Sequence, residues 1–493
     1  MLFLSLLPIF VFIILVIFTK IDLTKISLVF FGLTLGLSLL VWRIYFYIAA
    51  AATLKGIFIA LDIFLIVFGA LLFLKIINGR QILDQLCFYL EKISPDYRIQ
   101  TILIAWFFES FIEGVTGFGT PITIAAPILV SLGLSPITAV AIALLGNSTA
   151  VAFGAAGTPI RVGFTGLNIN GVPFYSALFN LIGFIIPLFM LWLATRHQSD
   201  AKNDFLDAIP FAVFSGFCVV VPSFLVVFLG QEFPSIIGPI IGLVLVILAI
   251  KFKLFLPSVT KTLRPATAPT KLLPLRTTLF PYTLLIALLI FAKFLFGNLG
   301  FSFNFGLSHT FALFNPGLIF IITAIIIGFT WHIKPKDFFV SSLNSFKTSM
   351  TSFLVIALIS GVTQLMIHSH QNYSQLPSFL EIIASRFQTK FLPFITPLIG
   401  GFGSFMNGSG TISNLMFGSI LHTVSSNLNF NQAIILSLQN TGSAAGNIIS
   451  IADVLPALTI LDLSSKTVSV LKMVIIPCLV YLFLLGIIGM III

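Results

Sequence analysis

Two glutamates stand four residues apart within a long apolar stretch of the sequence. Glu109 and Glu113 occur in FFESFIEGVTGFGTP, so on a helix they share one face and lie one turn apart. An ionisable side chain at membrane depth is costly and by default indicates a functional site, such as a proton relay. The alternative is that one or both lie near a membrane interface or bond a neighbouring helix end. We expect Glu113, which directly precedes a glycine-rich break, to carry protons with help from Glu109.

Small polar residues gather at four interruptions of the apolar pattern, near residues 114–121, 146–160, 400–411 and 439–451. A helix broken at membrane depth exposes backbone N–H and C=O groups, which is tolerated only beside protein or a water-filled cavity. Such groups can hold a small carboxylate and hydroxyl, although each side chain could instead bond a carbonyl of its own helix. The residues expected to contact a small ligand are Thr116, Gly117, Gly119, Thr120, Asn147, Ser148, Thr149, Ser409, Thr411, Asn414, Asn440 and Thr441.

A single arginine follows the second of these interruptions. Arg161, in GTPIRVG, could grip a carboxylate with two parallel hydrogen bonds. The alternative is an arginine at the membrane interface that extends toward the lipid headgroups. The sequence contains no P-loop, metalloprotease motif or metal-ligand spacing. We therefore expect no metal, no cofactor and no enzymatic activity.

The composition indicates which elements must position these residues. Of 493 residues, 58% are hydrophobic and 8% are charged, whereas soluble domains carry about a quarter charged residues. Apolar runs long enough to cross a bilayer as helices recur from end to end. We expect an all-α polytopic membrane protein with about 12–14 spans in the bacterial cytoplasmic membrane. The formal charge is +10, but the basic residues sit in short loops, which is typical of cytoplasmic loops and not of a nucleic-acid surface.

One basic, proline-rich segment divides the chain. Residues 251–276 hold six Lys or Arg, four prolines and no acidic residue. Such a segment is typical of an exposed cytoplasmic linker. We expect the linker at 256–278, between transmembrane halves at 1–255 and 279–493.

Each half repeats one order of signals. GFGT at Gly117–Thr120 precedes GNSTAVAFGAAGTPI at 146–160, and GFGS at Gly401–Ser404 precedes QNTGSAAGNIISI at 439–451. The matching signals begin on opposite predicted sides of the membrane, which is typical of inverted-topology repeats with broken or re-entrant helices at a mid-membrane site. We expect the glycines of GFGT and GFGS to mark breaks that approach each other. The alternative is that these small residues serve close helix packing.

The two motifs of the first half resemble the L-lactate permease family, whose members import lactate and glycolate with protons. The family pattern is close to F-x-E-G-x-x-G-F-G-x-P followed by N-T-x-P-V-A-F-G-x-x-G-x-P. The matching positions are Glu113, Gly114, Gly117, Phe118, Gly119, Pro121, Asn147, Val151, Ala152, Phe153, Gly154, Gly157 and Pro159. In the second half, the positions that resemble T-G-S-D-T-x-S-N and N-T-T-G-G-V-T-G-K-M-I-S are Gly408, Ser409, Thr411, Ser413, Asn414, Asn440, Thr441, Gly442, Gly446, Ile449 and Ser450.

Two positions depart from the family pattern. The aspartate of the pattern is Gly410 here, and its lysine is Asn447. Since an unpaired buried charge is costly, the joint loss of one acid and one base fits the removal of a whole ion pair between neighbouring positions. The resemblance implies a divergent family member.

The sequence therefore predicts a secondary transporter that imports a small monocarboxylate, above all lactate or glycolate, with protons. A sodium-coupled or other organic-anion transporter is the main alternative, and a membrane-embedded enzyme or a channel fits the pattern less well. The expected partners are the carboxylate, protons and the lipid bilayer, without nucleic acid. The oligomeric state stays open.

Overall fold

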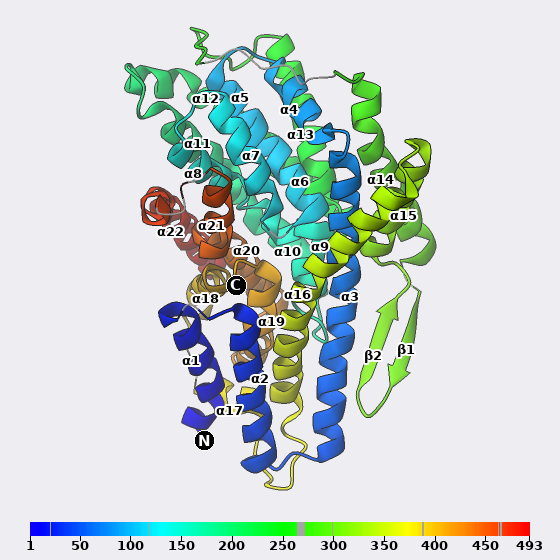
Figure 1. Cartoon of the computed structure of the whole chain (residues 1–493). Coiled ribbons are helices and arrows are strands. Elements are labelled where there is room, and N and C mark those ends of the chain that lie inside the picture. The colour runs from blue at the N-terminus through cyan, green and yellow to red at the C-terminus, as the bar shows by residue number, and fades with distance from the viewer. Residues whose placement is uncertain are drawn as a thin grey trace.

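The computed structural model describes residues 1–19, 21–117, 119–263, 272–297, 299–386, 389–461, 463 and 466–493. Most of the regular structure is helical, with one antiparallel hairpin, β1 (Gly300–Asn304) and β2 (Ser308–Ala312) (Figure 1). The helices of the first half are α1 (Leu2–Phe18), α2 (Leu23–Leu40), α3 (Phe46–Asn78), α4 (Ile82–Glu91), α5 (Tyr97–Ile102), η1 (Leu103–Phe108), α6 (Glu109–Thr116), α7 (Thr120–Ser131), α8 (Pro136–Gly146), η2 (Ala150–Phe153), α9 (Gly154–Arg161), α10 (Val172–Asn180), η3 (Leu181–Ile185), α11 (Ile186–Thr195), α12 (Ala201–Val226), η4 (Val227–Leu229) and α13 (Pro234–Lys251). Those of the second half are α14 (Leu275–Phe296), α15 (Pro316–Thr330), α16 (Pro335–His368), α17 (Phe379–Ala384), α18 (Leu392–Asn407), α19 (Gly410–Asn427), α20 (Gln432–Gly446), η5 (Asn447–Ile449), α21 (Ile451–Ile460) and α22 (Thr467–Ile492).

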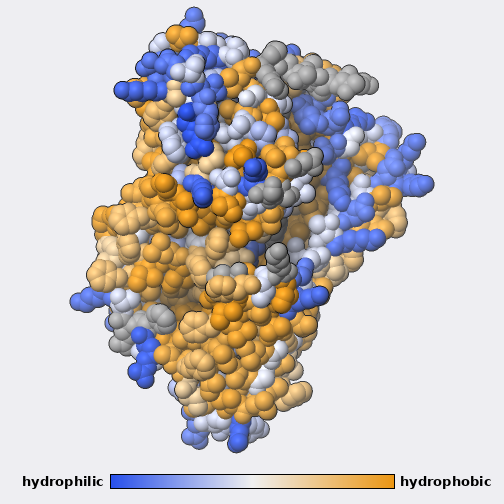
Figure 2. Space-filling model, turned by 60° about the vertical axis from the view of Figure 1, so that its left-hand side comes forward, coloured by the Kyte–Doolittle hydropathy of each residue, from blue (hydrophilic) through white to orange (hydrophobic). Residues whose placement is uncertain are grey.

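Many of these helices are long and apolar. Ten within the described ranges could cross a membrane, or up to eleven if the bent pair Pro136–Gly146 and Ala150–Arg161 counts as one span. Three shorter apolar helices cover Leu2–Val16, Thr120–Ser131 and Pro316–Thr330. Figure 2 shows hydrophobic residues over a broad part of one face, with hydrophilic residues at its top and bottom. The protein is an all-α polytopic membrane protein, as its composition predicts.

Counting apolar spans from the basic linker predicts that segments 78–98 and 332–347 lie on the same side of the membrane as the linker. In the structure these segments meet at one end of the molecule. Arg80, at the end of α3, donates to the carbonyl of Trp331 at 2.9 Å. Tyr89 of α4 donates to the carbonyl of Leu273 in the basic linker at 2.7 Å. The part of the linker at 264–271 lies outside the described residues. These contacts join three segments for which the sequence predicts one common side.

The continuous helix α5–η1–α6 runs through the centre of the protein. The Asp96 side chain caps its start by accepting from the Arg98 N–H at 2.9 Å. Every residue from Tyr97 to Thr116 is buried, and a π-helical turn occupies Leu103–Phe108. Such turns alter which side chains share a face and are frequent at functional sites. The carboxyls on α6 are therefore enclosed by protein and do not face lipid.

The first-half break lies at its glycines, whereas the second-half break does not. Helix α6 ends at Gly117 (φ 63°), and α7 begins after Gly119 (φ 69°). In contrast, α18 is continuous through Gly401–Gly403 and ends at Gly408 (φ 70°). The expectation of a break at the GFGS glycines is therefore wrong, and the discontinuity follows Asn407, where Ser409 caps α19.

Two further interruptions follow α8 and α20. After Gly146 the chain forms a turn, η2 and then α9, which contains left-handed backbone at Ala155, Ala156 and Gly157. After Gly446 it forms η5, an extended Ser450 and α21. Helix α9 contacts α19 of the other half, and α21 contacts α7. Each half thus places its late interruption against the early break of the other half.

Candidate functional site

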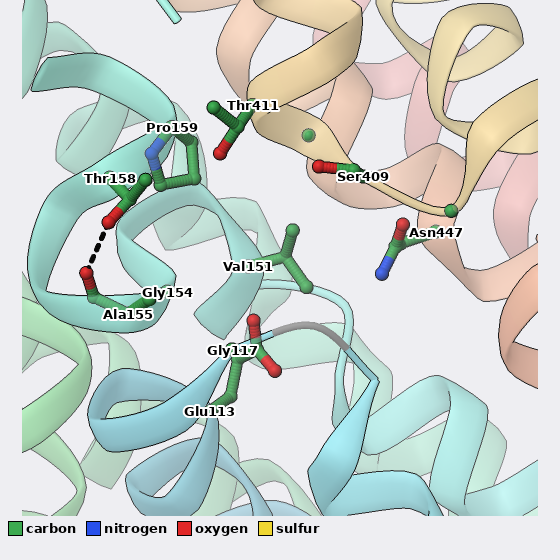
Figure 3. Close-up of a pocket in the computed structure, with 12 residues that line it drawn as sticks. Glu113, Gly117, Val151, Gly154, Ala155, Thr158, Pro159, Ser409, Thr411 and Asn447 are labelled. Atoms are coloured by element: carbon green, nitrogen blue, oxygen red, sulfur yellow. Dashed lines mark hydrogen bonds between the residues drawn. The ribbon is translucent and has the colours of Figure 1, made fainter. Parts of the chain in front are cut away.

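A small pocket lies where these interruptions meet, and we call it the inner pocket. It is lined from both halves by Glu113, Gly117, Val151, Gly154, Ala155, Thr158, Pro159, Gly408, Ser409, Gly410, Thr411 and Asn447. Figure 3 shows the first-half residues on one side and Ser409, Thr411 and Asn447 on the other. The space open to the centre of a water-sized sphere is about 20 Å³, which is room for about one water molecule. In this conformation the pocket is too small to hold a carboxylate substrate.

Glu113 places a carboxyl at the wall of the inner pocket. The residue is 3% exposed. Its Oε1 packs against Gly154 so closely that a Cβ atom there would overlap it. Its Oε2 has no hydrogen-bond partner in the described part of the chain. Asn147 interacts with this carboxyl, although no hydrogen bond of normal geometry joins them. One carboxyl oxygen of Glu113 is thus buried and unpaired among the described residues.

Glu109 lies one turn earlier and outside the inner pocket. It is fully buried, and both carboxyl oxygens lack a hydrogen-bond partner among the described residues. A Cβ atom at Gly146 would come within 2.6 Å of its Oε2. A buried carboxylate without partners is strongly disfavoured relative to the neutral acid. The two glutamates also interact electrostatically.

The second half contributes a helix N-terminus to the inner pocket. Ser409 caps α19 by accepting from the Ile412 N–H, and Gly410 and Thr411 form the first turn. Free N–H groups and the helix dipole make such an end attractive to an anion. The hydroxyls of Ser409, Thr411 and Thr158 lie around it. Among the described lining residues there is no Lys, Arg or His.

The two positions that depart from the family pattern are neighbours, as expected. Gly410 and Asn447 both line the inner pocket. Asn447 Oδ1 is buried and has no hydrogen-bond partner within the described ranges. With glycine and asparagine at these positions, the described lining residues of the second half give the pocket no fixed charge.

Three of the predicted ligand contacts bond carbonyls of their own helices or turns. Thr116 donates to Ile112 at 2.9 Å, Ser148 to Leu145 at 2.7 Å and Thr441 to Ser437 at 2.8 Å. These hydroxyls therefore bond nearby backbone carbonyls, which is the alternative to ligand contact expected for such residues. Gly117, Ser409 and Thr411 line the inner pocket, whereas Gly119 and Thr120 begin α7 beside it.

Asn414 and Asn440 form a buried amide network between the halves. Asn414 Nδ2 donates to Pro159 O at 3.0 Å and to Asn440 Oδ1 at 2.8 Å. Asn440 Nδ2 donates to Ala152 O at 3.1 Å and to Ser176 Oγ at 3.2 Å. Neither residue lines the inner pocket. These amides hold the interrupted segments of the first half against α19 and α20.

Thr149 and Arg161 lie apart from the inner pocket. Thr149 lines a separate cavity with Asn180, and Asn147, Asn440 and Thr441 line neither of these two cavities. Arg161 donates from Nη2 to the carbonyl of Phe314 at 2.6 Å, while its Nη1 is buried and unpaired among the described residues. The polar residues expected to share one site thus lie in different places, among them the inner pocket, a separate cavity and the amide network.

The sequence analysis missed one carboxyl near the site. Asp453 of α21 is 6% exposed, and its Oδ2 is buried without a hydrogen-bond partner in the part of the chain that is described. Its Oδ1 lies against Gly119, and the residue interacts electrostatically with Glu113. The sequence does indicate Asp453, because in NIISIADVL an acidic residue follows a break within an apolar segment.

Comparison with known proteins decides the family. The family model described as L-lactate permease matches residues 2–299 and 298–493. The chain belongs to the L-lactate permease family. A relative from Haemophilus influenzae is 32% identical, and its alignment covers 84% of this chain and 84% of its own. The L-lactate permease of Escherichia coli strain K12 is 24% identical and covers 93% of this chain and 89% of its own. The glycolate permease GlcA of the same strain is 26% identical, over 73% of this chain and 71% of its own.

Among solved structures, the crystal structure of the Alcanivorax borkumensis YdaH transporter aligns with a TM-score of 0.46 at 12% identity. The alignment covers 86% of this chain and 84% of that chain, but the similarity is too low to define function. Family membership and the apolar helices identify a multi-pass protein of the bacterial cytoplasmic membrane.

Proposed function

We propose that this protein is a secondary transporter that imports lactate, glycolate or a closely related monocarboxylate together with protons, without changing the substrate chemically. One observation carries the proposal. The inner pocket sets the buried carboxyl of Glu113 opposite the N-terminus of α19 and the hydroxyl of Thr411. Named members of the family, the L-lactate and glycolate permeases of Escherichia coli, support this substrate class.

The two sides of the inner pocket suit two different ligands. The N-terminus of α19 and its hydroxyls are complementary to a carboxylate. A charged Glu113 would repel that carboxylate across a pocket of low dielectric, whereas a protonated Glu113 would not. Substrate binding therefore favours proton uptake by Glu113, and departure of the substrate favours proton release. This mutual dependence is the physical basis of coupling in the proposal.

Coupling also solves an energetic problem. Carrying an anion inward against an inside-negative potential costs about 2.3 kcal/mol per 100 mV. One proton carried with the anion cancels its charge and adds the pH gradient as a driving force. Because the inner pocket is too small for the substrate in this conformation, substrate binding requires the two halves to move apart around it. Interrupted helices from paired halves are suited to such alternating access.

Uptake of labelled lactate and glycolate into proteoliposomes tests the proposal. We expect accumulation above the external concentration when the exterior is acidic, and equilibration only when no pH gradient is imposed. A parallel measurement imposes a sodium gradient with equal pH inside and outside the proteoliposomes. Accumulation driven by sodium alone would replace proton coupling, equilibration under every gradient would indicate a channel, and recovery of a chemically altered substrate would indicate an enzyme.

A further inference from the structure

A second and larger pocket, which we call the outer pocket, adjoins the inner pocket. It has a volume of about 260 Å³ and is lined by Asp22, Leu23, Thr24, Thr351, Ser352, Val355, Ile356, Asn407, Gly408, Ser409, Ile412, Ala452 and Asp453. Gly408 and Ser409, at the break between α18 and α19, line both pockets. The second-half break is thus the wall that separates them.

The far rim of the outer pocket faces water. It is formed by the α1–α2 turn, where Asp22 and the adjacent Lys25 are exposed. The Thr24 N–H donates to Asp22 at 2.7 Å, and this hydrogen bond holds the pKa of Asp22 below its ordinary value. An exposed charged carboxylate is not stable against lipid tails. The outer pocket therefore provides a route for water toward the break.

Asp453 stands at the inner end of that route. Its Oδ1 packs over Gly119, and a Cβ atom at Gly408 would lie 3.7 Å from the same oxygen. Both glycines have positive φ and begin or end broken helices. The other oxygen, Oδ2, is buried and unpaired within the described ranges. The carboxyl thus lies between the two early breaks, one from each half.

The charges around this carboxyl favour a proton over a substrate anion. Carboxyls line both pockets (Glu113 the inner, Asp453 and Asp22 the outer), and no basic side chain lines either one among the described residues. Glu109, one turn from Glu113, is the other titratable group on α6. The described residues contain no cluster of three or more His, Cys, Asp or Glu that could hold a metal ion. Two carboxyls separated by a small polar break suit proton transfer.

We propose, building on the proposed function, that Asp453 is the second proton carrier of this transporter and exchanges protons between the outer pocket and Glu113 across the Gly408–Ser409 break. The O–H bond of the Asp453 carboxylic acid breaks as the proton passes, first across the Gly408–Ser409 break and then through water in the inner pocket, to a carboxylate oxygen of Glu113. A new O–H bond forms there, and Asp453 remains as a carboxylate that takes its next proton from the outer pocket. Transfer in the opposite direction follows the same path.

Asp453→Asn tests this assignment in proteoliposomes, with Asp84→Asn on the exposed face of α4 as the matched control. We expect Asp453→Asn to exchange labelled for unlabelled substrate but to lose accumulation driven by a pH gradient, whereas Asp453→Glu and Asp84→Asn retain both. Normal proton-driven accumulation by Asp453→Asn would overturn the assignment while leaving the proposed function intact. The assignment would also be overturned if Asp453→Asn lost accumulation driven by a sodium gradient and kept accumulation driven by a pH gradient.

A measurement without substrate separates this inference from the proposed function. Infrared difference spectra between acidic and alkaline pH report carboxyl protonation in the purified protein. We expect Asp453→Asn to remove one titrating carboxyl signal and Glu113→Gln to shift that signal, since the two groups interact. A spectrum of Asp453→Asn identical to that of the wild type would overturn the inference, even if the protein transported neither lactate nor glycolate.

Discussion

The two breaks that meet at the inner pocket carry charge in different ways. The first-half break, between α6 and α7, presents the Glu113 carboxyl. The second-half break, between α18 and α19, has no ionisable lining residue in the inner pocket and presents a helix N-terminus with Ser409 and Thr411. One break can therefore gain or lose a proton, while the other offers fixed dipoles to an anion. The comparison suggests that, at the inner pocket, the first-half break takes up the proton and the second-half break binds the substrate.

The largest effect on transport is expected at Gly154, which packs against the carboxyl of Glu113. A Cβ atom at Gly154 would overlap Oε1 of Glu113. Gly154→Ala must displace the carboxyl from the inner pocket, and we expect it to abolish accumulation driven by a pH gradient. Gly32→Ala is the control, because a Cβ atom there meets nothing within 4 Å. Equal accumulation by both variants would mean that the position of Glu113 does not matter.

A loss of stability is expected where the two halves are joined by amides. Asn440→Leu removes the hydrogen bonds to Ala152 and Ser176 and the one that Asn440 Oδ1 accepts from Asn414, which keeps its bond to Pro159. We expect the free energy of unfolding to fall by about 1–3 kcal/mol, the cost of leaving buried polar groups unpaired. Thermal unfolding of the purified protein measures this, with Asn147→Leu as the contrast, since Asn147 makes no hydrogen bond through its side chain among the described residues. The same melting temperature for Asn440→Leu and the wild type would contradict the structural role.

A smaller effect is expected at the anion-binding break. Thr411→Val removes one hydroxyl from the inner pocket and keeps the shape of the side chain. We expect the apparent affinity for lactate or glycolate to weaken by up to about tenfold, which corresponds to roughly 1.4 kcal/mol for one hydrogen bond. The accumulation ratio at saturating substrate should stay unchanged, and Thr411→Ser should restore affinity. An altered accumulation ratio with unchanged affinity would reverse the roles of the two breaks.

The sequence predicted the membrane helices and the burial of Glu113, but two similar glycine motifs led to the same prediction of a break in both halves. GFGT breaks a helix, and Pro121 follows at the start of the next one, where proline is well tolerated. GFGS lies within α18, because its glycines serve packing. A Cβ atom at Gly442 or Gly446 of α20 would overlap the backbone of α18. The packing alternative thus applies to the glycines of GFGS, whereas Gly117 and Gly119 of GFGT lie where one helix ends and the next begins.

The polar residues of the candidate site were harder to assign. Thr116, Ser148 and Thr441 bond carbonyls close to them in the chain, and nothing in the sequence distinguishes them from Thr411, which faces the inner pocket. Local bonding depends on side-chain rotamers that the spacing of residues does not reveal. Asp453 differs in this respect, since an acid in an apolar segment is recognisable without a structure.

The central claim is that proton uptake by Glu113 drives accumulation while the opposite break binds the substrate. Glu113→Gln keeps the shape of the side chain and removes its titrating proton, and Glu109→Gln is the matched control one turn away outside the inner pocket. With a one-unit pH gradient and no membrane potential, we expect the wild type and Glu109→Gln to accumulate substrate up to about tenfold. Glu113→Gln should reach only equal concentrations, while still exchanging labelled for unlabelled substrate. Tenfold accumulation by Glu113→Gln would contradict the account.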